Sequence, residues 1–160
     1  MTLPSVPAGR QTVSAYLVSR HALKALDYYR DVFGATEAYR LMMPDGRLGH
    51  AEFCIGNSTV MISDEFLEYG CKSPSTLGGS PITMHVYVDD VDAVFQKALD
   101  AGAKERTPVM DQFYGDRSGQ IEDPFGHIWC IATHKQDISP EEMQRHIRES
   151  SSTNEPQNPS

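Results

Sequence analysis

The sequence contains two similar stretches: residues 13–35, VSAYLVSRHALKALDYYRDVFGA, and residues 82–103, ITMHVYVDDVDAVFQKALDAGA. Each begins with a short apolar run of alternating character, which is typical of a strand. Each continues with apolar residues at helical spacing and ends in a Gly-Ala pair, where glycine favours the end of a helix. Gly102 follows Gly34 by 68 residues (102 − 34), and this offset indicates an internal repeat of a strand and a helix.

Shorter strand-like segments follow each of the two expected helices. They cover residues 37–43, 49–55 and 59–63 in the first half, and residues 104–110, 116–122 and 127–133 in the second. The turns between them contain Pro44-Asp45-Gly46, Gly56-Asn57 and Asp123-Pro124-Phe125-Gly126. Each half is therefore predicted to be a β-α-β-β-β module, and the chain is predicted to be an α+β protein.

The repeat also predicts the domain organisation. Residues 12–138 are expected to form a single domain with repeats at 12–69 and 82–134, joined by a Ser/Gly/Pro-rich linker at 70–81. Residues 1–11 are predicted to be a flexible arm. Ser139, Pro140 and Glu142 have the pattern of a capping box, so a C-terminal helix is expected over 139–148. The Ser/Asn/Pro/Gln-rich end, residues 149–160, is predicted to be a disordered tail.

Composition excludes several classes of protein. The 160 residues include 22 acidic and 14 basic ones, for a net charge of −8, so neither nucleic acid nor an anionic membrane surface is an expected partner. No apolar run approaches the length of a membrane span, and no secretory signal is evident. Three widely spaced cysteines without a CxxC motif favour reduced thiols and a cytoplasmic location. The acidic balance suits a cationic ligand, although solubility alone also explains it.

Several short motifs of the sequence resemble those of one known family. Residues 28–35 (YYRDVFGA), 88–93 (VDDVDA) and 123–127 (DPFGH) are similar to the vicinal oxygen chelate superfamily, which contains glyoxalases, extradiol dioxygenases, fosfomycin resistance enzymes and bleomycin-binding proteins. Residues 43–46, 49–52 and 62–65 look most like its PhnB-like, glyoxalase/bleomycin-resistance branch. The resemblance, over roughly residues 12–138, implies that the tandem modules form a curved mixed sheet around a cavity. It also implies a homodimer.

Alternation along the two repeated strands predicts which side chains face that cavity. Val13, Ala15 and Leu17 share one face with Met84, Val86 and Val88 of the repeat, and these apolar sets would pack against the helices. The opposite faces carry Ser14, Tyr16, Thr83, His85 and Tyr87. With the resemblance, the expectation is one pocket into which Tyr16, His85 and Tyr87 point, with Met61 and Cys130 at its floor.

The resemblance also locates the positions that hold a metal in metal-dependent members of the superfamily. They fall on Ser14, Met61, Thr83 and Cys130, and this set lacks the carboxylate and imidazole donors that a divalent ion prefers. The sequence therefore predicts no metal and no other cofactor. A rival metal site would need His50, Glu52 and His85 to converge, which the sequence does not establish.

These observations lead to one functional hypothesis and two alternatives. The hypothesis is a metal-free small-molecule binding protein that sequesters a hydrophobic or cationic compound. The first alternative is a metal-dependent lyase or dioxygenase-type enzyme built around His50, Glu52 and His85, and the second is a scaffold domain without a ligand. The sequence leaves catalysis open and assigns no catalytic residue. The expected ligand-binding residues are Tyr16, Met61, Thr83, His85, Tyr87, Tyr114, Arg117 and Cys130.

Two of these residues also have structural interpretations. Arg117 is expected to form an ion pair with Asp116 or Asp123. Cys130 lies beside Trp129 in an apolar strand, so its thiol is expected to be buried, to have a raised pKa and to be unreactive.

Overall fold

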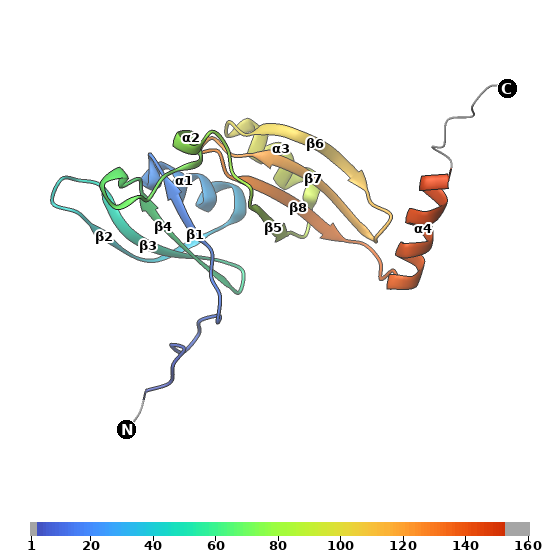
Figure 1. The fold of residues 1–160 in the computed structure, drawn as a ribbon, viewed down its shortest axis with the longest axis horizontal. Coiled ribbons are helices and arrows are strands. Elements are labelled where there is room, and N and C mark those ends of the chain that lie inside the picture. Colours follow the sequence, from blue (N-terminus) through green and yellow to red (C-terminus); the bar gives the residue numbers. More distant parts are fainter. Residues whose placement is uncertain (1–2, 153–160) are drawn as a thin grey trace.

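A computed structural model describes residues 3–152 and shows two β-α-β-β-β modules in tandem, followed by a separate helix (Figure 1). The first module contains β1 (Tyr16–Ser19), α1 (Ala22–Phe33), β2 (Thr36–Met42), β3 (Leu48–Ile55) and β4 (Ser58–Asp64). The second contains β5 (Thr83–Tyr87), α3 (Val91–Asp100), β6 (Lys104–Asp111), β7 (Asp116–Glu122) and β8 (Ile128–His134). Between the modules lie a 3-10 turn, η1 (Leu67–Tyr69), and a short helix, α2 (Pro74–Leu77); α4 (Pro140–Ser152) follows β8.

The two sheets have the same strand order, which confirms the internal repeat. They run β1-β4-β3-β2 and β5-β8-β7-β6, with a parallel first pair and antiparallel pairs after it. Tyr16 is opposite Met61 in the first sheet, and His85 is opposite Cys130 in the second. Both equivalent pairs are 69 residues apart (85 − 16 and 130 − 61). The α+β class and the tandem modules expected from the sequence are therefore confirmed.

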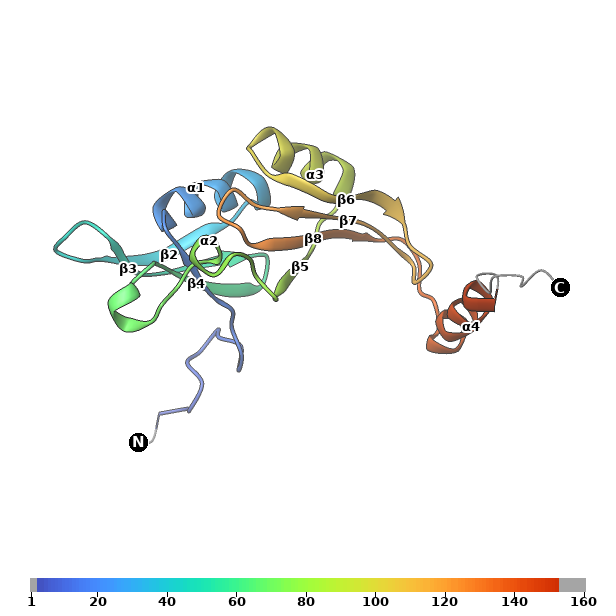
Figure 2. The same cartoon turned by 45° about the horizontal axis from the view of Figure 1, so that its top comes forward.

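Each sheet has one face covered by its own helix. Figure 2 shows α1 and α3 on the same side of the two sheets. Leu17 and Val86 point toward this side and are buried, whereas Tyr16 and Tyr87 point away and are exposed. The expected alternation is confirmed within β1 and β5. Val13, however, precedes β1 and is 84% exposed, so it does not pack against a helix as expected. Among residues 3–152, no helix covers the outer face of either sheet.

The sheets remain separate and do not close around a cavity within one chain, in contrast to the single curved sheet expected from the resemblance. The modules are instead joined by an aromatic core. Trp129 of β8 contacts Tyr29 and Phe33 of α1, with ring centroids 5.3 and 4.6 Å apart, and Tyr29 also stacks on Phe53 of β3. Trp129 is therefore a core residue, as its apolar strand predicts.

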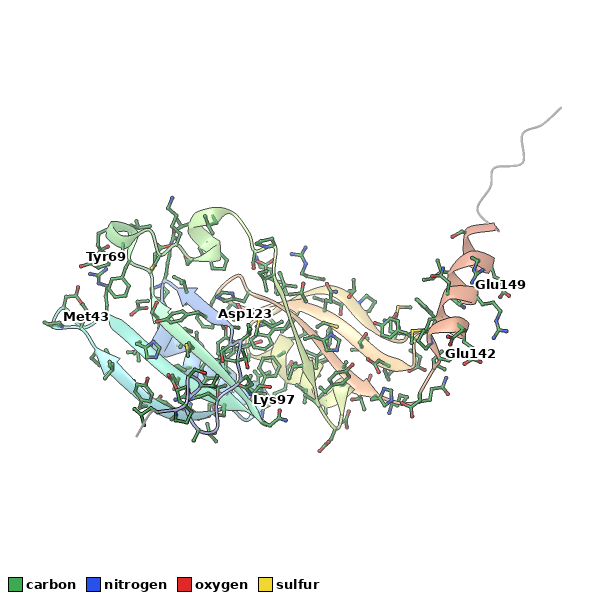
Figure 3. The ribbon with its side chains drawn as sticks, turned by 60° about the horizontal axis from the view of Figure 1, so that its bottom comes forward. Met43, Tyr69, Lys97, Asp123, Glu142 and Glu149 are labelled. Carbon is green, nitrogen blue, oxygen red and sulfur yellow. The ribbon has the colours of Figure 1, made fainter. Side chains whose placement is uncertain are left out.

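Asp123, in the turn between β7 and β8, anchors this core. It lies where the two modules meet (Figure 3) and is almost fully buried. Its Oδ2 accepts hydrogen bonds from the Tyr29 hydroxyl at 2.7 Å and the Trp129 indole N–H at 2.9 Å. Its Oδ1 accepts the backbone N–H groups of Phe125 and His127, each at 2.9 Å. One carboxylate thus holds the turn and links the modules.

Aspartates also fix the starts of α1 and α3. Asp64, at the end of β4, accepts the backbone N–H of Ala22 at 2.8 Å and that of Leu48 at 2.6 Å. The pair Asp89-Asp90 before α3 offers two carboxylates that could cap this helix, and the structure selects Asp90, which accepts the N–H of Ala93 at 3.0 Å.

The chain outside the modules departs from expectation in three places. The expected linker, residues 70–81, contains the short helix α2, which the sequence analysis did not predict. Helix α4 runs to Ser152, so residues 149–152 are helical and not part of a tail, while residues 153–160 lie outside the described residues. The third difference is in the N-terminal arm, which was expected to be flexible but is attached to the body near its end through the side chains of Arg10 and Gln11.

The predicted capping box at the start of α4 is present, because Ser139 Oγ accepts the Glu142 N–H at 3.2 Å.

Candidate functional site

The outer face of the first sheet carries a connected group of polar and aromatic side chains, here named the first-sheet cluster: Tyr16, Tyr39, His50 and Glu52. Alternation along β3 puts His50 and Glu52 on one face, and the β2–β3 pairing brings Tyr39 opposite Glu52. The Tyr16 hydroxyl lies 2.8 Å from His50 Nδ1, and the Tyr39 hydroxyl donates to Glu52 Oε1 at 2.8 Å. His50 Nε2 lies 3.4 Å from the same Glu52 oxygen. A continuous hydrogen-bonded chain therefore crosses three strands.

Glu52 is the buried charge of this cluster, with only 6% of its side chain exposed. Its second oxygen, Oε2, forms an ion pair with the Arg10 guanidinium, which comes from the arm that precedes β1. A buried carboxylate is stable only when it is paired or hydrogen-bonded, and here both oxygens have a partner.

The environment sets the protonation states of the neighbouring rings. Burial lowers the pKa of His50, and the positive charge of Arg10 lowers it further. Burial raises the pKa of Tyr16. A neutral His50 that accepts from Tyr16 at Nδ1 carries its proton on Nε2, which faces Glu52. The lowered pKa of His50 thus favours a neutral imidazole beside the Glu52 carboxylate.

The outer face of the second sheet carries another group, the second-sheet cluster: Tyr87, Asp116, Ser118, Cys130 and His134. Asp116 is buried at the start of β7, and the Tyr87 hydroxyl donates to its Oδ2 at 3.0 Å. His134 Nδ1 lies 2.8 Å from Asp116 Oδ1. Ser118 and Cys130 lie further along the same face of β7 and β8. This face can therefore offer hydroxyl, carboxylate and imidazole groups to a ligand.

These contacts also shift pKa values in the second-sheet cluster. The hydrogen bond to Asp116 raises the pKa of Tyr87, and burial adds to this effect. The carboxylates of Asp116 and Asp137 raise the pKa of His134. Burial raises the pKa of the Cys130 thiol, so the expected burial and raised pKa of this cysteine are confirmed.

Two hollows adjoin these clusters. One, of about 410 Å³, lies between the modules and is lined by Ser14, Thr59, Met84, His85 and Tyr87, among others. The other, also about 410 Å³, lies at the far end of the first module. Its lining includes Tyr16, Met43, Phe66, Tyr69 and Cys71, and Figure 3 shows Met43 and Tyr69 at that same end.

The structure does not place the expected cavity residues together in one pocket of a single chain. Tyr16 lines the end hollow, while His85 and Tyr87 line the hollow between the modules, with their rings 4.8 Å apart. Met61 and Cys130 are in different sheets. Alternation correctly gives the face of each residue, but the arrangement of the two modules separates the faces.

The other expected ligand-binding residues have different positions. Thr83 is exposed at the start of β5. Tyr114 is half-buried beside the second-sheet cluster, with its hydroxyl 3.4 Å from Ser118 Oγ. Arg117 alternates with Asp116, so it points toward α3 and forms two 2.8 Å hydrogen bonds to Asp92 and one of 3.2 Å to Asp111. Arg117 therefore forms structural ion pairs, but with Asp92 and Asp111 and not with the expected Asp116 or Asp123. It lies on the face opposite the second-sheet cluster.

The donor groups do not fit a metal at either expected location. The positions implied by the resemblance hold serine, methionine, threonine and a protonated cysteine, which are poor ligands for a divalent ion. Within residues 3–152, no group of three or more His, Cys, Asp or Glu side chains is arranged to hold an ion. His50 and Glu52 do meet, but His85 lies on the other sheet. The rival metal site is therefore not assembled in the chain.

Sequence reasoning missed Arg10, Tyr39, Asp116 and Ser118 at the two clusters. Alternation and hairpin pairing could have located three of them, because Tyr39 is opposite Glu52 and Asp116 and Ser118 follow one face of β7. No comparable signal exists for Arg10, whose contact with Glu52 joins residues 42 positions apart (52 − 10) through an irregular segment.

Fold and site together define a class: paired β-α-β-β-β modules whose uncovered sheet faces carry polar and aromatic residues. The model of the Glyoxalase/Bleomycin resistance protein/Dioxygenase superfamily matches residues 12–131, and the chain belongs to this family. An uncharacterized protein of Mycobacterium tuberculosis (strain ATCC 25618 / H37Rv) is 44% identical over 135 residues, which cover 82% of this chain and 79% of that relative.

Solved structures show the same fold. The structure of an Arabidopsis thaliana gene product has a TM-score of 0.62 and 25% identity, covering 76% of this chain and 98% of that one. The fosfomycin resistance protein FosX of Listeria monocytogenes, complexed with Mn(II) and sulfate, has a TM-score of 0.61 and 15% identity, with coverages of 85% and 97%. At that identity the likeness to FosX concerns the fold alone. Among residues 3–152, no helix is long and apolar enough to cross a membrane.

Proposed function

We propose that this chain is a metal-free small-molecule binding protein of its superfamily, which sequesters an organic compound on the outer faces of its sheets. The observation that carries the proposal is that these faces combine exposed aromatic rings with buried, hydrogen-bonded polar groups. Tyr16 and Tyr87 are 48% and 61% exposed, while Glu52 and Asp116 on the same two faces are buried. Rings supply contact area and a few fixed polar groups supply orientation, as in most ligand sites.

The proposal includes a homodimer in a reducing, cytoplasmic compartment. The apolar side chains of Leu41 and Met110 lie exposed on the outer faces, and a second copy would cover them. The cysteines Cys54, Cys71 and Cys130 are free thiols, which suits the cytoplasm.

Calorimetry with compounds from a thermal-shift screen tests the binding proposal. Tyr16→Ala or Tyr87→Ala should weaken a compound that binds by roughly tenfold, because each removes an aromatic contact of about 1.5 kcal/mol. Leu77→Ala, at an exposed position in α2, is the control and should leave the affinity unchanged. Equal affinities for all variants would contradict the proposed faces.

Elemental analysis tests the metal-free part. Protein purified without an affinity tag and dialysed should hold far less than one equivalent of zinc, nickel, iron or manganese, because neither donor set fits an ion. About one equivalent per chain, lost in His50→Ala, would favour the enzyme alternative instead.

A further inference from the structure

We propose that Glu52 is a subsite for a cationic group of the ligand, a guanidinium or a primary ammonium, and that Arg10 fills this subsite until the ligand displaces it. This inference rests on the proposed function and adds the chemical class of the ligand to it. Arg10 then acts as an internal competitor supplied by the N-terminal arm.

The first argument is the position of Glu52. It lies in the middle of β3 on the outer face, where its carboxylate is buried although no helix covers that face. Tyr39 satisfies Oε1, and Oε2 points to the Arg10 guanidinium. A buried anion with one oxygen committed to a neutral donor favours a cation at the other, because an unpaired buried charge is costly.

The second argument is that the cation comes from a weakly held segment. Arg10 lies outside both modules, six residues before β1 (16 − 10). Residues 3–9 are mostly exposed, so few contacts oppose displacement of this end of the chain. Gln11 is fixed to the body, since its side chain donates to the Asn57 carbonyl at 2.6 Å and accepts the Thr59 N–H at 3.2 Å. The arm can therefore release Arg10 while Gln11 stays bound.

The third argument is that the surroundings suit an organic cation. The rings of Tyr16 and Tyr39 lie 5.5 and 5.7 Å from His50, so three rings line this part of the face. Aromatic rings attract a guanidinium or ammonium group. Tyr16 also lines the end hollow of about 410 Å³. A ligand with its cation at Glu52 could thus place an apolar body beyond Tyr16.

Benzylguanidinium and its neutral analogue benzylurea are the probes for the test, measured by calorimetry on the full chain. Arg10→Ala should bind benzylguanidinium at least tenfold more tightly than the wild type, because the competing guanidinium is gone. The double variant Arg10→Ala/Glu52→Gln should lose this gain. Arg40→Ala, which removes an exposed arginine paired with Glu37, is the matched control and should behave as the wild type.

Several outcomes would overturn the cation subsite. One is an equal affinity of the wild type and Arg10→Ala for benzylguanidinium. The others are an increase in affinity that remains in Arg10→Ala/Glu52→Gln, and an equal increase in the affinity of Arg10→Ala for benzylurea. If Arg10→Ala unfolds, Arg10→Gln keeps a hydrogen-bond donor without the charge and should show the same gain. One result would separate the two proposals. If benzylurea binds the wild type but not Tyr87→Ala, and Arg10→Ala does not bind benzylguanidinium more tightly, the cation subsite is wrong while the proposed function stands.

Discussion

Among single residues, Asp123 shows the structural role of the DPFGH motif at residues 123–127. Its carboxylate accepts four hydrogen bonds, two from the backbone of its own turn and two from aromatic side chains in different modules. Hydrogen bonds to a charged acceptor are stronger than neutral ones, particularly where water is excluded. Asp123 therefore couples a local turn to the packing of the whole chain.

Asp123→Asn should lower the free energy of unfolding by about 3 kcal/mol. The amide nitrogen would face either the Trp129 indole N–H or the two backbone N–H groups of the turn, none of which can accept, so at least one buried donor would lose its acceptor. Urea denaturation measures the effect. Asp31→Asn, at an exposed surface pair with Arg30, is the control and should change stability by less than about 0.5 kcal/mol. A similar effect of both variants would contradict this role of Asp123.

His134 predicts a pH dependence of stability. Its two carboxylate partners raise its pKa in the folded state above the ordinary value of 6.5. The folded chain therefore binds this proton more tightly than the unfolded chain does. The stabilising contribution is fully present below pH 6.5 and is lost as the pH rises through the folded pKa.

His134→Gln should therefore be less stable than the wild type near pH 6, and the difference in melting temperature should shrink as the pH rises toward 8.5. Thermal denaturation across this range measures it. Gln144→Ala, at an exposed position in α4, removes no titratable group and should show no such trend. A difference that stays constant with pH would show that the His134 charge does not contribute.

Sequence reasoning succeeded for residues whose role is local. The aspartate cap of α3, the buried thiol of Cys130 and the core position of Trp129 follow from neighbours in the sequence. The partners of Arg10 and Arg117 were not predicted, because they become neighbours only when the chain is folded. Asp92 lies in the first turn of α3, and only the packing of that helix on β7 brings it to Arg117.

Among the secondary-structure elements, the spacing of apolar residues and the residue types in the turns were sufficient to predict the strands of both modules within a few residues. The end of α4 was missed because Glu149 and Ser150–Ser152 are polar residues that give no apolar stripe. Helix α4 stands away from the sheets in Figures 1 and 2, and His146 stacks on Phe113 in the β6–β7 loop, with ring centroids 4.6 Å apart.

A chain that stops after Ile138 should keep the melting temperature of the two modules within a few degrees. The core that joins the modules lies among α1, β3 and β8, and among the described residues none of α4 belongs to it. Calorimetry measures the transition, and circular dichroism should show the loss of helical signal. Phe113→Ala is the companion variant and should also leave the transition nearly unchanged. A large drop in either would mean that α4 packs against the body or a second copy.

At the scale of the whole molecule, the sequence predicts two modules but not how they face each other. Alternation determines the face on which each candidate ligand-binding residue lies. The relative position of the sheets depends on the aromatic core around Tyr29 and Trp129, whose contacts span about 100 residues (129 − 29). This is why residues expected in one pocket line two separate hollows.

The outer faces predict self-association. Leu41 of β2 and Met110 of β6 are 59% and 53% exposed, and their pairing with His50 and Ser118 puts each on the outer face of its sheet. Exposed apolar side chains beside a polar cluster favour burial against a second copy. Sedimentation should therefore find a dimer for the wild type, and Leu41→Glu/Met110→Glu should shift it toward monomer by at least tenfold in dissociation constant, because charged groups are costly to bury. Leu77→Glu adds one charge at an equally exposed apolar position in α2 and should leave the dimer intact. A monomeric wild type, or equal dissociation constants for all three proteins, would mean that these faces are not the contact between copies.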